Sequence, residues 1–272
     1  MKIDTSKFAT KEALFDYLRE NKEKIMTAKK AEIKHADAVI MPFFETDTEQ
    51  VEKAFRIPAS PDVLKQDKFT IKAVINTTNL LDSHGDVHIP GLWNKSVKEN
   101  KMPFLLKEHN MKFDFVISDE VKASVQEIEW KTIGQPYEGT TQALVYDATV
   151  TTGEAAGMDE KYANGKVKQH SVGMYYVKLF LAMNSTNQRD KEEKKIWDKY
   201  YQTIANKETA DEAGYFWAVT EAKQIEGSAV LLGSNFATPP IGITAEPDMS
   251  TPKNIQEPLK DTPKSGWEFF NY

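Results

Sequence analysis

The sequence predicts an α+β protein that is mainly β, in which the strands close, or nearly close, into a barrel with helices at its periphery. About seven short segments alternate apolar and polar residues, or are rich in β-branched and aromatic residues, and such segments are typical of strands. Two or three helical segments interrupt them, and long excursions separate the strands. Because strands and helices do not alternate along the chain, the pattern favours a barrel over a doubly wound parallel sheet.

The composition is that of a globular protein, since 40% of the 272 residues are hydrophobic and 28% are charged. The chain has no cysteine, which excludes disulfides, a cysteine nucleophile and a thiolate metal site. A net charge of −6 without a basic stripe argues against nucleic-acid binding. No apolar run is long enough to cross a membrane and the first residues do not form a signal peptide, so we expect a cytosolic protein with no membrane partner.

The chain is expected to have a helical N-terminal part, a β-rich body and a polar tail. Thr10 can cap a helix that runs to about Ile33. The proline-containing tail cannot bury enough apolar surface to fold alone. The predicted parts are an N-terminal helix and irregular connector over 1–66, a body over 67–243 with a helical insertion over 184–214, and a flexible Pro-rich tail over 244–272.

The strands of the body are predicted over Phe69–Asn76, Phe113–Trp130 (one or two strands), Ala143–Thr151, Lys166–Leu181, Tyr215–Ala222 and Gln224–Leu232. Helices are predicted over Leu92–Asn100, Gly153–Asn164 (with a turn) and Asn187–Lys207. Asn79–Gly91 is predicted to be a loop.

Ser171 lies in the strand predicted over Lys166–Leu181, where a small hydroxyl on a face of bulky residues leaves room for a substrate carbonyl or for packing. Gly173, two residues later, adds to that room. His109 follows an apolar run and is expected at a strand end. The residues predicted to share the face of Ser171 are Val167, Tyr175, Val177 and Leu179.

Acyl transfer by a serine needs a base within hydrogen-bond reach and a third group that orients the base. His109 is the candidate base for Ser171, and the candidate third groups are Glu226, Glu221 and Asp147. His170 directly precedes the serine, so on a strand it points to the opposite face. We therefore expect it to be a partly buried or surface histidine.

A second interpretation concerns the segment LDSHGDVHIPG at Leu81–Gly91. In an extended conformation His84, Asp86 and His88 would converge on one face, and two imidazoles with a carboxylate are ligand types for a catalytic Zn²⁺ or Fe²⁺. The same residues are compatible with a polar turn, since Asp, Gly and Pro are turn formers.

Four motifs in order resemble the prohead maturation proteases of tailed phages, serine proteases related in fold to the herpesvirus assemblins. The resemblance covers about residues 69–243. Three features depart from the pattern. His170 stands where a small or apolar residue is usual, Gly227 replaces a β-branched residue, and the helical insertion at Asn184–Gly214 is longer than expected. The motifs are DSHGDVHIPG at Asp82–Gly91, FLLKEH at Phe104–His109, SVGM at Ser171–Met174 and IEGSAV at Ile225–Val230.

The resemblance implies a closed β-barrel of the herpesvirus-protease kind with His109 as general base, Ser171 as nucleophile and Glu226 as the acidic partner, without a cofactor or metal. It implies cleavage of scaffold and major capsid protein inside the immature phage head in the host cytoplasm, by a homodimer. We further expect that the N-terminal helix, the tail or both direct the protease into the head and are removed autocatalytically, because their sequences look loosely tethered. The alternatives are a metal-dependent hydrolase that uses His84, Asp86 and His88, and a catalytically inactive capsid or scaffold component.

Overall fold

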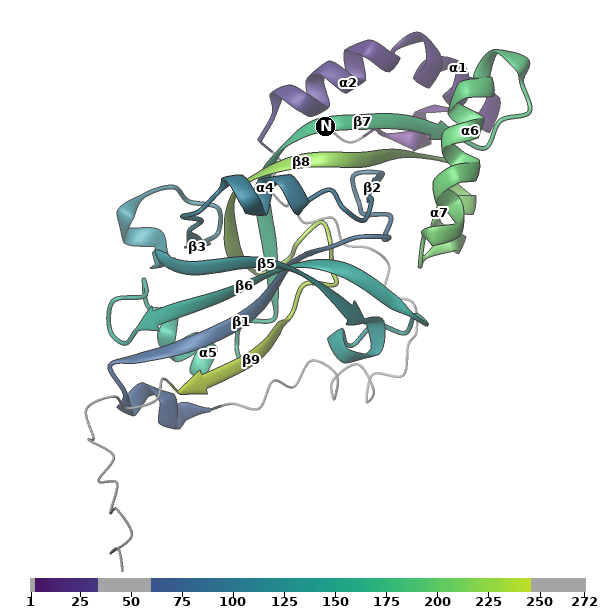
Figure 1. The fold of residues 1–272 in the computed structure, drawn as a ribbon. Coiled ribbons are helices and arrows are strands. Elements are labelled where there is room, and N and C mark those ends of the chain that lie inside the picture. Colours follow the sequence, from purple (N-terminus) through teal and green to yellow (C-terminus); the bar gives the residue numbers. More distant parts are fainter. Residues whose placement is uncertain (1–2, 34–59, 246–272) are drawn as a thin grey trace, which may run out of the picture.

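The computed structural model describes residues 3–33 and 60–245 and has an α+β fold with two sheets (Figure 1). One sheet is antiparallel, with the strand order β5-β6-β1-β9. Its strands are β1 (Lys68–Thr77), β5 (Glu120–Glu129), β6 (Thr140–Thr151) and β9 (Pro240–Ala245). The expected α+β class is confirmed, whereas the ladders of the described strands do not join the two sheets into one closed barrel.

The second sheet is built around one long strand, β8 (Tyr215–Val230), and has the order β2-β8-β3-β4. β8 pairs antiparallel with β7 on one edge, and on the other edge it pairs parallel with β2 and β3. The sequence predicts two strands here, but register shifts on both sides of Lys223 absorb the irregularity and the ladder continues. The remaining strands are β2 (Asp86–His88), β3 (Leu105–Lys107), β4 (Val116–Ser118) and β7 (Gln169–Met183).

The face predicted for β7 is only partly correct. Ser171 and Leu179 are buried, whereas Tyr175 and Val177 are 38% and 41% exposed. Three register shifts along the β7–β8 ladder interrupt the alternation of faces on which the prediction depends.

The N-terminal part forms two helices, α1 (Lys11–Glu20) and α2 (Lys22–Ala31), which lie over β7 and β8 (Figure 1). The predicted cap is present, since Thr10 Oγ1 accepts the N–H of Ala13 at 3.2 Å. The predicted single helix is interrupted at Asn21, which leaves the helical conformation at φ −105° and ψ 9°. Leu14, Leu18 and Ile25 are buried in the main core, so the pair is packed on the body through an apolar stripe.

The helices predicted in the body are present with shorter bounds than expected. The segment predicted as one helix over Asn187–Lys207 contains a single α-helix that ends at Tyr200, and the predicted loop at Asn79–Gly91 contains β2. The helices are α4 (Asn94–Glu99), α5 (Asp159–Ala163), α6 (Lys191–Tyr200) and α7 (Lys207–Ala213), and the 3₁₀ turns are Thr5–Lys7, Pro61–Lys65, Phe113–Phe115, Trp130–Ile133, Gln188–Asp190 and Tyr201–Thr203.

Most of the predicted connector and tail lie outside the described residues. Within the described residues, no helix is long and apolar enough to cross a bilayer. The main core lies between the two sheets and includes Phe69 and Tyr146 from the antiparallel sheet and Val172 and Trp217 from the β7–β8 pair. That core fixes which face of β7 and β8 points inward, and it therefore places the candidate site on the opposite face.

Candidate active site

His109 lies two residues beyond the end of β3 and is held against β8. Its Nδ1 is 2.6 Å from Glu226 Oε1, and the two side chains are 9% and 2% exposed. The backbone of Glu108 and His109 is left-handed, with φ of 54° and 53°. Consecutive left-handed residues other than glycine are costly, at about 1–3 kcal/mol each, and such strain concentrates at functional sites.

Glu226 is also bound by a second side chain, Ser228. The Ser228 hydroxyl donates to Glu226 Oε2 at 2.6 Å and accepts the backbone N–H of His109 at 3.1 Å. Ser228 is fully buried. Both oxygens of the carboxylate are therefore engaged, one by the imidazole and one by the hydroxyl.

Ser171 lies one strand away, on the same face of the sheet. It pairs directly with Ser228 in the β7–β8 ladder, and Gly173 pairs with Glu226. Cross-strand partners have Cβ atoms about 5 Å apart and share a face. The carboxylate of Glu226 extends over Gly173, where an added Cβ would lie 2.1 Å from Oε1. In the described part of the chain, no hydrogen bond joins Ser171 to the imidazole Nε2 of His109. Such pairs are often loose without substrate.

Glu226 is the acid that contacts His109, whereas the other two candidates lie elsewhere. Glu221 pairs with Lys178 at 2.5 Å and with Lys95 at 3.2 Å. Asp147 lies on β6 of the other sheet. Of the candidate third groups, the structure thus brings only Glu226 to the imidazole.

His170 is fully buried, which corrects the expectation of a partly buried or surface residue. Its Nδ1 is 3.1 Å from the carbonyl oxygen of Thr238, and its Nε2 is 2.8 Å from the Tyr162 hydroxyl. Burial lowers the pKa of His170 to about 4. A neutral ring that donates to the carbonyl and accepts from the phenol satisfies both contacts, so His170 supports the fold behind Ser171.

The structure does not assemble the proposed metal ligands as the sequence predicts them. Asp82, rather than His88, joins His84 and Asp86, and the ligand atoms of these three residues lie within 4.8 Å of one another. Asp82 Oδ1 accepts the backbone N–H groups of His84 and Asp86, so it closes a turn. The ammonium of Lys29, from α2, lies 2.5 Å from Asp86 Oδ1. These contacts favour the polar-turn interpretation.

Burial controls the ionisation of this loop. The pKa of Asp82 is raised to about 7 by burial and by the neighbouring Asp86 carboxylate. Burial lowers the pKa of His88 to about 4. His88 lies 3.0 Å from Asn76 Oδ1 and 3.2 Å from the Tyr176 hydroxyl, and that hydroxyl also donates to Asp86 at 2.8 Å. His88 is thus part of a buried network that ties α2, β2 and β7 together.

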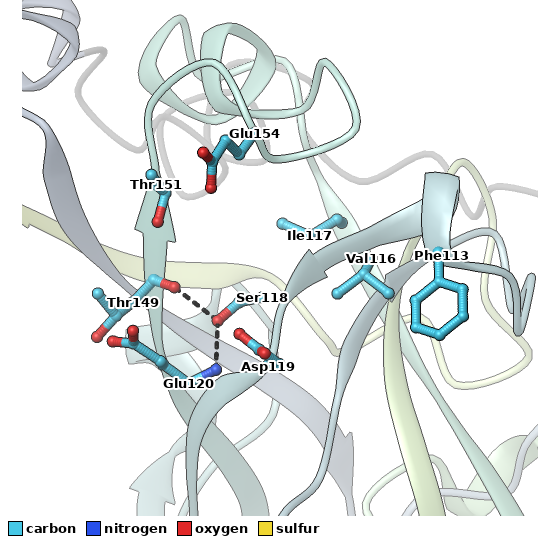
Figure 2. Close-up of a pocket in the computed structure, with 9 residues that line it drawn as sticks. All are labelled: Phe113, Val116, Ile117, Ser118, Asp119, Glu120, Thr149, Thr151 and Glu154. Carbon is cyan, nitrogen blue, oxygen red and sulfur yellow. Dashed lines mark hydrogen bonds between the residues drawn. The ribbon is translucent and has the colours of Figure 1, made fainter.

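A pocket of about 180 Å³ lies beside β4, and Figure 2 shows its lining. Val116, which lines the pocket, lies in the same row of paired residues across the sheet as Ser171. The row runs from Val116 on β4 to Leu106 on β3, then to Ser228 on β8 and Ser171 on β7. Three strand spacings separate the ends of this row, or about 14 Å. The pocket holds none of the predicted site residues.

Two features of the site are not predicted from the sequence. The first is the contact of Ser228 with Glu226, for which the sequence offers one indication, because residues two apart on a strand share a face. The left-handed turn at Glu108–His109 has no signal in residue type. No protein-family model, no curated protein and no solved structure matches the chain.

Proposed function

We propose that this chain is a serine endopeptidase in which Ser171 is the nucleophile, His109 the general base and Glu226 the group that orients the base. The observation that carries the proposal is the 2.6 Å contact between His109 Nδ1 and Glu226, on the same face of the sheet as Ser171. A serine hydroxyl is a weak nucleophile until a base takes its proton, and a base acts efficiently when a carboxylate holds its tautomer.

The chemistry follows from these positions. With Nδ1 bound to Glu226, Nε2 is the ring nitrogen that takes the proton from Ser171 Oγ as the oxygen attacks the peptide carbonyl. The C–N bond then breaks, the imidazolium returns the proton to the leaving amine, and an acyl-enzyme ester remains. Water attacks the ester with the same base, which releases the acid and restores the hydroxyl.

The physiological role is proposed from the order of the motifs. The substrates would be scaffold and capsid-protein segments in an immature phage head, and the enzyme would be a homodimer. The finer fold assignment, a closed barrel of the herpesvirus-protease kind, belongs to the same proposal. The His109–Glu226 contact supports the proposed role and the proposed fold, because it joins two of the motifs that carry the resemblance.

A fluorophosphonate probe tests the nucleophile without knowledge of the cleavage site. We expect the full chain to be labelled at Ser171, with the adduct located by mass spectrometry, and labelling to persist in EDTA. Ser171→Ala should abolish labelling, and co-expression with a capsid precursor should then leave the precursor uncut. Loss of a triad member reduces turnover on the order of 10³-fold or more.

Ser118→Ala is the matched control, because Ser118 is also a buried strand serine, 5% exposed, but it binds a backbone carbonyl of Thr149. That variant should be labelled like the unaltered chain. A chain that is folded but not labelled at Ser171, or a cleavage activity that EDTA abolishes, would refute the serine mechanism.

A further inference from the structure

We infer that Ser228 is a positioning residue of this site, whose hydroxyl joins the Glu226 carboxylate to the main chain of His109. The inference rests on the proposed function and adds a fourth residue to it. Ser228 follows Glu226 by two positions on β8, so both side chains lie on one face, and the register of the β7–β8 ladder places Ser171 directly across from Ser228.

The two contacts of the hydroxyl have opposite directions. Its proton goes to Glu226 Oε2 at 2.6 Å, and its oxygen accepts the His109 N–H at 3.1 Å. The first contact limits rotation of the carboxylate about its last side-chain bond. The second contact holds the backbone nitrogen of the residue that carries the imidazole. One side chain therefore restrains both partners of the His109–Glu226 pair.

This restraint matters because the chain around His109 is strained. Glu108 and His109 both have positive φ, and neither is glycine. A strained conformation persists only where surrounding contacts determine it. Glu108 N donates to the carbonyl of Ala229 at 3.0 Å, so β8 binds two successive N–H groups of the turn, one through its backbone and one through Ser228.

The matched comparison is Ser185, which makes the same pair of contacts at a distance from the site. Its hydroxyl donates to Asp190 at 2.6 Å and accepts the N–H of Asn187 at 3.1 Å. Ser228→Ala and Ser185→Ala remove the same chemical group from the same kind of buried environment. A stability effect common to both variants therefore reports the lost hydrogen bonds alone.

The experiment measures kcat and KM on a cleavable capsid precursor, together with the NMR signal of the His109 Nδ1 proton. We expect Ser228→Ala to lower kcat about tenfold, which corresponds to about 1.4 kcal/mol, with KM changed less than about twofold. The Nδ1 proton signal should broaden or disappear, because the carboxylate is no longer fixed. Ser185→Ala should change neither kcat nor the signal, and Ser228→Thr, which keeps the hydroxyl, should recover most of both.

Equal kcat in the two alanine variants, with the Nδ1 signal retained in both, would overturn the inference. The NMR readout needs no turnover, so it also separates the two proposals. Suppose that the unaltered chain shows no cleavage, while Ser228→Ala loses the imidazole signal. The proposed peptidase function then fails and the positioning role of Ser228 stands.

Discussion

Gly173→Ala is expected to disable the site through a single added methyl group. Gly173 pairs with Glu226 across the β7–β8 ladder, and the carboxylate occupies the space above it. The new Cβ would lie 2.1 Å from Oε1 and 3.0 Å from Cδ, whereas real Cβ contacts essentially never fall below 3.0 Å. The oxygen that binds His109 must therefore move by about 0.9 Å.

The carboxylate cannot make that movement freely. Glu226 is 2% exposed, and its two oxygens bind His109 and Ser228 at 2.6 Å each. A shift of nearly 1 Å breaks or misaligns one of these contacts, and a hydrogen bond to a charged group contributes about 1.5–3 kcal/mol. A misplacement of about 1 Å in a catalytic group lowers the rate by up to about 10²-fold.

We therefore expect kcat/KM to fall by about 10²-fold and fluorophosphonate labelling of Ser171 to slow. The free energy of unfolding in urea should change less than the catalytic rate does. Alanine lowers the conformational entropy of the unfolded chain, which stabilises the folded state by about 0.4–1 kcal/mol and offsets part of the loss. Gly242→Ala is the control, since its Cβ would meet only Lys72 Cβ at 3.6 Å. A Gly173→Ala variant that cleaves and labels at the rate of the control would refute the placement of the Glu226 carboxylate over Gly173.

Two further predictions concern stability. Burial lowers the pKa of His170 to about 4 from 6.5, so between these pH values the unfolded chain binds a proton that the folded chain does not. The free energy of unfolding should thus fall by up to about 3 kcal/mol as the pH falls from 6.5 to 4, and urea titrations of His170→Gln should show a correspondingly weaker pH dependence. Lys29→Met leaves the buried carboxylate of Asp86 without its cation and should cost about 3–5 kcal/mol, whereas the exposed pair of Lys194 and Asp198 should contribute about 0–1 kcal/mol in the same assay. Unfolding free energies of Lys29→Met and Lys194→Met that agree within error would contradict the buried ion pair.

Much of the fold could be predicted because the strands of the body carry clear patterns. The alternation in Phe69–Asn76 and Ala143–Thr151 marks β1 and β6, which pair in the structure. The pairing of distant segments is less visible, because parallel contacts such as β3 with β8 depend on tertiary packing. The choice of Glu226 among three acids could not be made from strand patterns alone, because that choice depends on which strands are neighbours.

The charged N-terminal helices show why a pattern of residue types is insufficient. Lysines on a helix are typical of a solvated face, but Lys29 of α2 is fully buried and binds Asp86. Arg19 likewise reaches Asp190 at 2.5 Å, and Lys22 reaches Glu193 at 2.6 Å. Acidic residues remote in sequence therefore convert an apparently solvated face into a docking face.

The site itself depends on two glycines that lie on opposite faces of the β7–β8 pair. Gly173 makes room for the Glu226 carboxylate on the outer face, and Gly227 makes room for Tyr146 on the inner face, where a Cβ would lie 2.7 Å from the ring. In the motif, Gly227 counts as a departure from a β-branched residue. In this chain a β-branched residue would displace Tyr146 or push β8 outward and take Glu226 with it. The departure is therefore a local packing solution, and it supports Glu226 as the partner of His109.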